Sequence, residues 1–345
     1  MRIDNYIIDQ QSPVFIIAEL SANHNGSLET ALETVRAAKR AGADCIKLQT
    51  YTADTLTIDS NKDDFLIKGT IWEGKNYYQL YQEAYTPWEW HAEIMKVATE
   101  EGLICFSSPF DPTSVDFLET LNVPAYKIAS FEITDIPLIE YVASKGKPVI
   151  ISTGIATMED IQLALNACHR MGNRDIALLK CTSSYPAPIE EANMMMVRDL
   201  AERYGVISGL SDHTMGATVP VVATCFGAKI IEKHFILDHS IGGPDASFSM
   251  DEKEFGDMVK AVREAEKAIG QVDYTLTDKQ IKGRDFSRSL YVVEDIKAGE
   301  PITEKNVRSI RPGFGMHTKY YEEVLGKVAK CDLEKGTAMS WDKIN

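Results

Sequence analysis

The sequence predicts an α/β protein, a (β/α)8 barrel of the TIM type followed by a small, β-rich C-terminal domain. Three observations lead to this prediction. Short apolar runs alternate with amphipathic segments, the number of such runs is about eight, as in a closed parallel barrel, and the pattern changes after residue 270. A length of 345 residues suits one large α/β unit with a small appendage.

The apolar runs predict the barrel strands. They cover residues 14–19, 45–49, 103–107, 125–128, 148–152, 176–181, 206–211 and 229–234. Apolar residues at three- and four-residue spacing predict helices between them, among others over residues 28–41, 88–101, 158–171 and 254–269. This alternation implies parallel strands joined by crossover helices.

One connection, residues 51–86, is much longer than an ordinary loop between a strand and a helix. It is rich in aromatic side chains, including Trp72, Tyr77, Tyr78, Tyr81 and Tyr85. Insertions of this length usually cover a site. We expect either a capping subdomain with its own aromatic core or a lid that contacts a sugar.

The chain is expected to divide into a catalytic barrel (1–270), a polar linker (271–286) and a second domain (287–345). In the second domain short strands replace the helices, and Asp295-Ile-Lys-Ala-Gly299 is nearly repeated as Asp332-Leu-Glu-Lys-Gly336. A unit of this size should pack on a barrel, either its own or that of a partner.

Composition excludes several classes of protein. A formal net charge of −15 disfavours nucleic acids and anionic membranes as partners. No apolar run approaches the roughly 20 residues of a membrane helix, and the N-terminus lacks the features of a signal peptide, so we expect a cytoplasmic protein. The six cysteines are scattered and predict reduced thiols. A core thiol is favoured over a nucleophile for Cys181.

Polar residues end every predicted strand. The carboxyl ends of barrel strands form the active site of such folds. The residues in question are Glu19, Lys47, Gln49, Ser107, Ser108, Lys127, Ser130, Ser152, Thr153 and those at 182–185, 211–213 and 232–234. Any one of them could be an ordinary hydrogen-bonded residue, but their convergence from all strands predicts a functional site.

Lys47 and Lys127 lie in apolar surroundings, where an unpaired ammonium group is costly. A phosphate or carboxylate ligand would relieve that cost. The alternative is that each lysine pairs with Glu19 or Glu232. Hydroxyl groups could add hydrogen bonds to an anion, and the candidates are Ser108, Ser130, Ser152 and Ser211.

The last two predicted strands each lead into a histidine. If these strands are parallel neighbours, about 4.8 Å apart, His213 and His234 lie side by side. Two imidazoles with open positions suit a catalytic divalent ion, Mn²⁺ first, with Mg²⁺, Co²⁺, Fe²⁺ or Zn²⁺ as alternatives. Glu232 should point the same way as His234. For either histidine alone, a structural role is the simpler interpretation.

The same residues carry a family resemblance that runs nearly end to end. The motifs include Ala18-Glu-Leu-Ser-Ala-Asn-His-Asn-Gly26, Lys47-Leu-Gln49, Lys127-Ile-Ala-Ser130, Leu210-Ser-Asp-His-Thr214 and Glu232-Lys-His-Phe235. Together they resemble the sialic acid synthase family. The C-terminal unit, with Arg311-Pro-Gly-Phe-Gly315, resembles that family's antifreeze-like (SAF) domain. Residues 64–72, 86–91, 248–251 and 287–291 are most similar to the pseudaminic acid synthases within it.

The resemblance implies a transferase that condenses phosphoenolpyruvate with a 2-acetamido sugar, here 2,4-diacetamido-2,4,6-trideoxy-L-altrose. It places phosphoenolpyruvate on Lys47, Ser108, Lys127, Ser130, Ser152, Ser183 and Ser211. It places the sugar on Gln49, Tyr185, Asp245 and Arg311. Because the family inserts its arginine from the neighbouring subunit, it implies a domain-swapped homodimer. Glu19 and Glu232 are the candidates for proton transfer beside the ion on His213 and His234.

Two departures keep other sugars open. Gly243-Pro-Asp245 is more similar to sialic and legionaminic acid synthases, and Ala246 stands where several of those carry histidine. The alternative enzyme is therefore an N-acetylneuraminate or legionaminate synthase with the same chemistry. The alternative from another class is a catalytically idle carbohydrate-binding protein, which would have no use for two lysines, two histidines and carboxylates in one barrel mouth.

Overall fold

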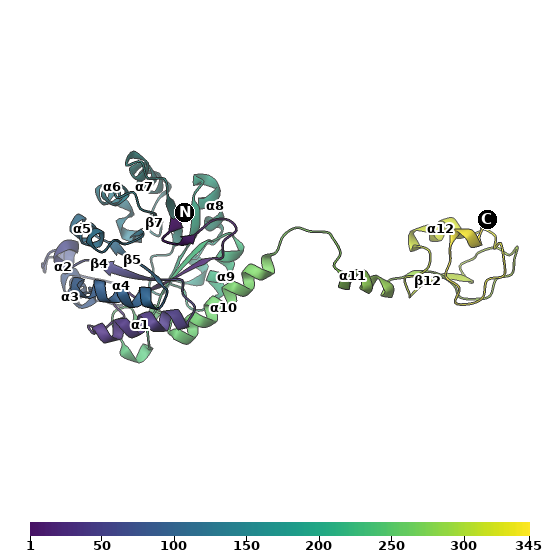
Figure 1. Cartoon of the computed structure of the whole chain (residues 1–345), viewed down its shortest axis with the longest axis horizontal. Helices are drawn as coiled ribbons and strands as arrows, with labels where there is room; N and C mark the ends of the chain where they lie inside the picture. Colours follow the sequence, from purple (N-terminus) through teal and green to yellow (C-terminus); the bar gives the residue numbers. More distant parts are fainter. The chain divides into compact units, whose positions relative to one another are not determined.

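The computed structural model describes residues 1–345, which form two compact units, Met1–Gly270 and Gln271–Asn345. The first unit is a closed barrel of parallel strands surrounded by helices (Figure 1). Its strands follow one another around the barrel in chain order, and the last strand pairs with the first. The predicted (β/α)8 architecture is confirmed.

The barrel strands agree with the predicted ones to within two residues at each end. They are β3 (Phe15–Glu19), β4 (Cys45–Thr50), β5 (Ile104–Pro109), β6 (Tyr126–Ile128), β7 (Val149–Ser152), β8 (Ile176–Cys181), β9 (Ile207–Asp212) and β10 (Ile230–His234). All residues of β3, β6 and β7 are buried, because each strand faces the barrel interior on one side and helices on the other. A small antiparallel pair, β1 (Arg2–Ile3) and β2 (Tyr6–Ile7), precedes the barrel.

The outer helices each bury an apolar face, and most of them begin at a polar cap. They are α1 (Leu28–Arg40), α4 (His91–Glu100), α5 (Pro112–Thr120), α6 (Ile136–Ala143), α7 (Met158–Arg170), α8 (Met195–Tyr204), α9 (Thr218–Cys225) and α10 (Glu252–Ile269). Ser27 caps α1 as its hydroxyl accepts a hydrogen bond from the Thr30 amide. None of the helices combines the length and apolar character needed to span a bilayer.

The insertion between β4 and α4 forms α2 (Ala53–Leu56), a 3₁₀ turn at Asp63–Phe65 and α3 (Tyr77–Ala84). Tyr51 lies between Tyr81 and Phe110, with ring centroids 5.7 and 5.1 Å away. The insertion therefore contains a small aromatic core, which was one of the two expectations. Trp72 of the insertion lies outside this aromatic core, next to Tyr185.

The second unit has its own apolar core around Leu290, Ile302 and Val307. It contains the antiparallel pair β11 (Ser289–Val292) and β12 (Val307–Ile310), and a short helix α12 (Tyr321–Val324). The near-repeated segments pair with each other, because Ile296 and Leu333, which occupy the same place in each copy, form a β-bridge.

The polar segment 271–286 is not entirely irregular. It contains the helix α11 (Asp278–Gly283) and a 3₁₀ turn at Arg284–Phe286. Thr277 and Gln280 form a capping box at the start of α11. The Thr-x-x-Gln spacing is the sequence signal of this helix, and the segment's polarity obscured it.

Candidate functional site

The polar strand ends gather at the carboxyl end of the barrel because neighbouring strands are in register there. Glu19 lies opposite Lys47 on one side and opposite His234 on the other. Glu232 lies opposite Ser211, whose hydroxyl donates to Glu232 Oε1 at 3.3 Å. The pairing of β9 with β10, on which the histidine prediction depends, is present.

Two lysines and two carboxylates form a buried ionic array in this mouth. Lys47 Nζ lies 2.9 Å from Glu19 Oε2 and 3.1 Å from Glu232 Oε1, and it donates to Ser108 Oγ at 3.3 Å. Lys127 Nζ lies 3.3 Å from the same Glu232 oxygen. The pairing of lysines with carboxylates, set out above as the alternative to an anion, is therefore realised. It offsets the cost of burying four charged groups.

The two carboxyl groups of this array differ in their pKa. Burial raises the pKa of Glu19, Lys47 opposes this shift, and the nearby Glu232 carboxylate adds to it, with a net change upward. Burial alone would also raise the pKa of Glu232, but Lys127 and Lys47 outweigh it and the net change is downward. Carboxyl groups whose pKa values are driven apart are suited to separate acid and base roles.

A cradle of hydroxyl groups lies around the ends of β6, β7 and β8. The hydroxyls of Ser130 and Ser183 are 2.7 Å apart, and the buried Ser152 hydroxyl has no hydrogen-bond partner. Gly154 lies directly against this group. A Cβ atom there would come within 2.2 Å of Ser183 Oγ and 2.5 Å of Ser130 Oγ. The cradle therefore offers an unused donor and a backbone that only glycine allows to come so close.

The rings of His213 and His234 lie side by side, with centroids 5.3 Å apart. His213 Nδ1 donates to the Thr182 carbonyl at 3.0 Å, so in the neutral ring the lone pair lies on Nε2. Burial lowers the pKa of His234 well below its usual value, and protonated His213 and Lys47 lower it further. His234 Nδ1 is buried without a hydrogen-bond partner and lies 3.7 Å from Asp245 Oδ2.

Aromatic rings surround the histidines. The ring centroid of Tyr185 lies 4.4 Å from that of His213 and 5.1 Å from that of Phe248. Trp72, from the insertion, lies 5.8 Å from Tyr185, and its indole donates to the Pro244 carbonyl at 3.0 Å. The insertion thus reaches the mouth through Trp72, and a lid that contacts a sugar stays a prediction.

The remaining sugar candidates differ in their location. Asp245 is buried and accepts a hydrogen bond from Ser21 at 2.5 Å. Gln49 is half-buried on β4, opposite Ser108. Arg311 is exposed in the second unit, directly after β12, so it does not belong to the barrel. The other predicted site residues all come from the barrel unit.

Glu132 also lies at this mouth, and the strand-end argument missed it. It sits in a 3₁₀ turn, Ser130–Thr134, that follows β6. Its Oε2 atom is buried without a partner, and burial raises the pKa of this carboxyl to about 7 although Lys127 opposes the shift. The sequence signal that could have identified Glu132 is its position two residues after Ser130.

Two family models match this chain. The NeuB family model covers residues 34–274, and the SAF domain model covers residues 287–345.

The chain belongs to the NeuB family.

The resemblance to sialic acid synthases is thereby confirmed. The chain is 50% identical over 339 residues to the pseudaminic acid synthase of Campylobacter jejuni, covering 98% of each chain. It is 35% identical over 335 residues to the N,N'-diacetyllegionaminic acid synthase of Legionella pneumophila, covering 96% of this chain and 94% of that one. A solved sialic acid synthetase of Leptospira borgpetersenii, in complex with citrate, matches 82% of this chain and 94% of its own, at a TM-score of 0.73 and 29% identity.

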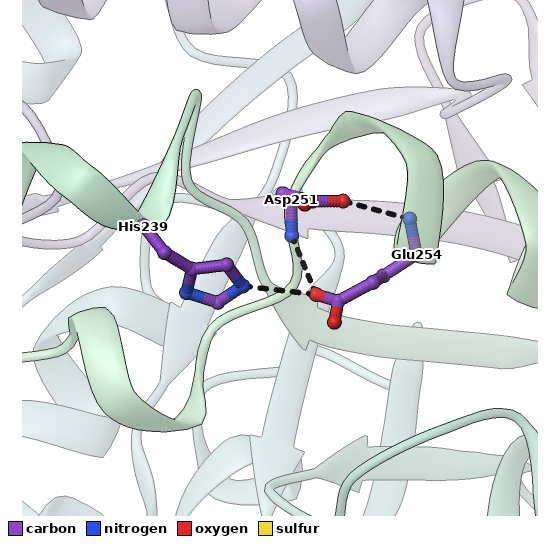
Figure 2. A group of neighbouring side chains, drawn as sticks. All are labelled: His239, Asp251 and Glu254. Carbon is purple, nitrogen blue, oxygen red and sulfur yellow. Dashed lines mark hydrogen bonds and ion pairs between the residues drawn. The ribbon is translucent and has the colours of Figure 1, made fainter.

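A second group of histidine and acidic side chains in this NeuB-family barrel lies at the start of α10 (Figure 2). His239 Nε2 lies 3.0 Å from Glu254 Oε2, which also accepts from the Asp251 amide at 3.1 Å. Asp251 Oδ1 accepts from the Glu254 amide at 2.8 Å. Because these atoms form the capping box of α10, their hydrogen-bonding capacity is used within the fold.

The cysteines are free, as expected. Four are buried, whereas Cys225 and Cys331 are exposed. Cys181 is buried beside the cradle, with Sγ 3.9 Å from Ser183 Oγ and 4.0 Å from His213 Nδ1.

Proposed function

We propose that this chain condenses phosphoenolpyruvate with 2,4-diacetamido-2,4,6-trideoxy-L-altrose to give pseudaminic acid and phosphate. The observation that carries the chemistry is the convergence of two buried lysines and two neighbouring imidazoles at one end of a barrel. The sugar is supported by the 50% identity to a pseudaminic acid synthase, against 35% to a legionaminic acid synthase.

Phosphoenolpyruvate would bind through Lys47 and Lys127. In the ligand-free array both ammonium groups share Glu232 Oε1, and an incoming anion can take over one side of each ammonium group without leaving a charge unpaired. The hydroxyl groups proposed to complete this site are those of Ser108, Ser130, Ser152, Ser183 and Ser211. The partnerless Ser152 hydroxyl supports this assignment, because a buried donor without a partner is costly.

A divalent metal ion fits the two histidines. His234 is neutral and buried with a partnerless nitrogen, and His213 keeps its lone pair on Nε2. We assign His213 and His234 as its protein ligands, with Mn²⁺ as the first candidate. When bound there, such an ion would act as a Lewis acid toward the oxygen of the open-chain aldehyde.

Two carboxyl groups would handle the protons of the reaction. Carbon 3 of phosphoenolpyruvate forms a bond to the aldehyde carbon, whose oxygen must gain a proton, and Glu19 is a suitable donor because its pKa is raised. Water then adds to carbon 2 and loses a proton. Glu132, with its pKa of about 7, is a suitable acceptor. Cleavage of the bond from carbon 2 to the phosphate oxygen releases phosphate and leaves the keto group.

Glu232 has a different role in this proposal. Its low pKa keeps it ionised, so it holds both lysines in place while its free Oε2 can orient water. Gln49, Tyr185 and Asp245 would contact the sugar hydroxyls from the mouth. Arg311 would contact an N-acyl group from a second copy of the chain in a domain-swapped homodimer.

The test is phosphate release from phosphoenolpyruvate with each sugar in turn. We expect the highest kcat/KM with the 2,4-diacetamido altrose. Faster turnover with N-acetylmannosamine or the legionaminic acid precursor would replace the sugar assignment. Sugar binding without phosphate release, with metal added, would instead favour the carbohydrate-binding protein.

A further inference from the structure

Ser21, in the turn after β3, has a backbone conformation that glycine normally adopts. Its φ angle is +47°, and its side chain is almost fully buried. A non-glycine residue in the left-handed region costs about 1 kcal/mol or more. Such strain persists only where the surrounding structure enforces it, and it is a reason to ask what the side chain does.

The hydroxyl of Ser21 donates to Asp245 Oδ2 at 2.5 Å, across 224 residues of sequence. This is a contact between two buried side chains, one from the loop after β3 and one from the loop after β10. Asp245 Oδ2 also faces His234 Nδ1 at 3.7 Å. The contact thus connects the strained turn to the centre of the mouth.

The main chain of Asp245 is held by a separate path. The hydroxyl of Ser249 donates to the Asp245 carbonyl at 2.7 Å, and Asn23 Nδ2 donates to Ser249 Oγ at 2.8 Å. The loop that carries Asp245 therefore stays anchored without Ser21. Ser21 adds a side-chain donor to the carboxylate itself, beside the backbone of Ala22.

We propose that Ser21 is a positioning residue that fixes the rotamer of Asp245, so that one carboxylate oxygen is occupied and the other is presented to the sugar. This inference rests on the proposed function, in which Asp245 receives a sugar hydroxyl. A turn that served the fold alone would be better made by glycine, because glycine adopts positive φ without strain. Serine at this position places a donor on the carboxylate at the cost of that strain.

The variants Ser21→Ala and Ser21→Gly separate the two roles. Both remove the hydroxyl, but only Ser21→Gly also relieves the strain. We expect each to lower kcat/KM for the sugar about tenfold, through KM, while KM for phosphoenolpyruvate stays unchanged. Ser21→Gly should melt a few degrees above Ser21→Ala. Sugar use that recovers with melting temperature in Ser21→Gly would overturn the proposal.

A double-mutant cycle with Asp245→Asn tests whether Ser21 acts through Asp245. We expect the double variant Ser21→Ala with Asp245→Asn to be no worse than Asp245→Asn alone. Additive losses would overturn the proposal. The matched control is Asn122→Gly, an exposed residue with φ of +53° after α5, which should leave both KM values unchanged.

Failure of the proposed function would be seen separately, since the wild-type chain would then release no phosphate with any of the acetamido sugars. The Ser21 variants are compared with whichever sugar the wild type turns over best. A defect confined to that sugar's KM supports the positioning role even if the preferred sugar is not the altrose.

Discussion

The carboxyl groups of Glu19, Glu132 and Glu232 share one chemistry but meet different neighbours. Glu232 touches two ammonium groups through one oxygen, whereas Glu132 is near Lys127 without an ion pair to it. Their pKa values move apart for that reason. At the residue scale, the site works by placing identical groups in unequal electrostatic surroundings.

Glu132 gives a prediction about stability and pH. Its folded-state pKa is about 7, above the ordinary value of 4.5, so between these values only the folded state holds the proton. Stability therefore falls as the pH rises through this window. We expect Glu132→Gln to be about 2 kcal/mol more stable than wild type at pH 8, and to lose this advantage near pH 4.5. Urea denaturation at both pH values measures it; a difference independent of pH would contradict the stated titration.

Gly154 gives a prediction about phosphoenolpyruvate. The Cβ atom of Gly154→Ala would collide with Ser130 and Ser183, so the cradle must open. We expect KM for phosphoenolpyruvate to rise at least about tenfold with little change in KM for the sugar. Gly256→Ala, on α10, is the matched control, because its Cβ would meet only ordinary contacts of 3.8 Å or more. Equal effects of both variants would contradict the cradle.

The strand-end rule found most of the mouth residues from sequence because strand residues alternate in direction and a barrel collects the strand ends. It missed Glu132 and the role of Ser21. Both lie in turns, where side-chain direction depends on individual φ and ψ angles rather than on a fixed period. The partner of Ser21 is also 224 residues away, which no local pattern reveals.

At the element scale, the barrel strands were predictable because buried parallel strands are short, continuous apolar runs. The pairing of β9 with β10 followed from their order and brought the histidines together. The internal structure of the insertion was not predictable. Its short helices depend on Tyr51, Tyr81 and Phe110 meeting across the fold rather than on periodicity.

The insertion gives a prediction through Trp72. Trp72→Ala removes the ring beside Tyr185 and the hydrogen bond to Pro244. We expect KM for the sugar to rise about tenfold, because the ring that confines Tyr185 is lost. Tyr78→Phe, which loses only exposed hydrogen bonds to Asp54 and Gln82, is the control in steady-state assays. Unchanged sugar kinetics in Trp72→Ala would limit the insertion to a structural role.

At the scale of the whole molecule, a net charge of −15 coexists with a mouth that contains two lysines. The acidic surface keeps the chain away from polyanions, while the local cations serve small anionic ligands. Each of the two units has an apolar core of its own.

Metal removal is the first whole-molecule prediction. We expect a chelator to abolish phosphate release and added Mn²⁺ to restore it, because the ion proposed on the two imidazoles would polarise the aldehyde. When Mn²⁺ is added back after the chelator, the variant His239→Ala, at the start of α10, should be as active as wild type. Full activity in chelator would remove the Lewis acid from the proposal.

Arg311 gives the second prediction at the scale of the whole molecule. We expect Arg311→Ala to raise KM for the sugar far more than KM for phosphoenolpyruvate, and light scattering to give the mass of a dimer for both proteins. At a sugar concentration too low for Arg311→Ala to turn over, a mixture of Arg311→Ala and Lys47→Ala chains that have exchanged should be more active than either variant alone if the arginine acts across subunits. No recovery on mixing would contradict the swap.

The hydrogen bonds between β10 and β3 have a consequence for biosynthesis. Because the first and last barrel strands pair with each other, no ribosome-bound fragment shorter than about 234 residues can close the barrel. The imidazoles of His213 and His234 also lie at the ends of the last two barrel strands, β9 and β10. The proposed metal site of a nascent chain can therefore form only when the barrel closes.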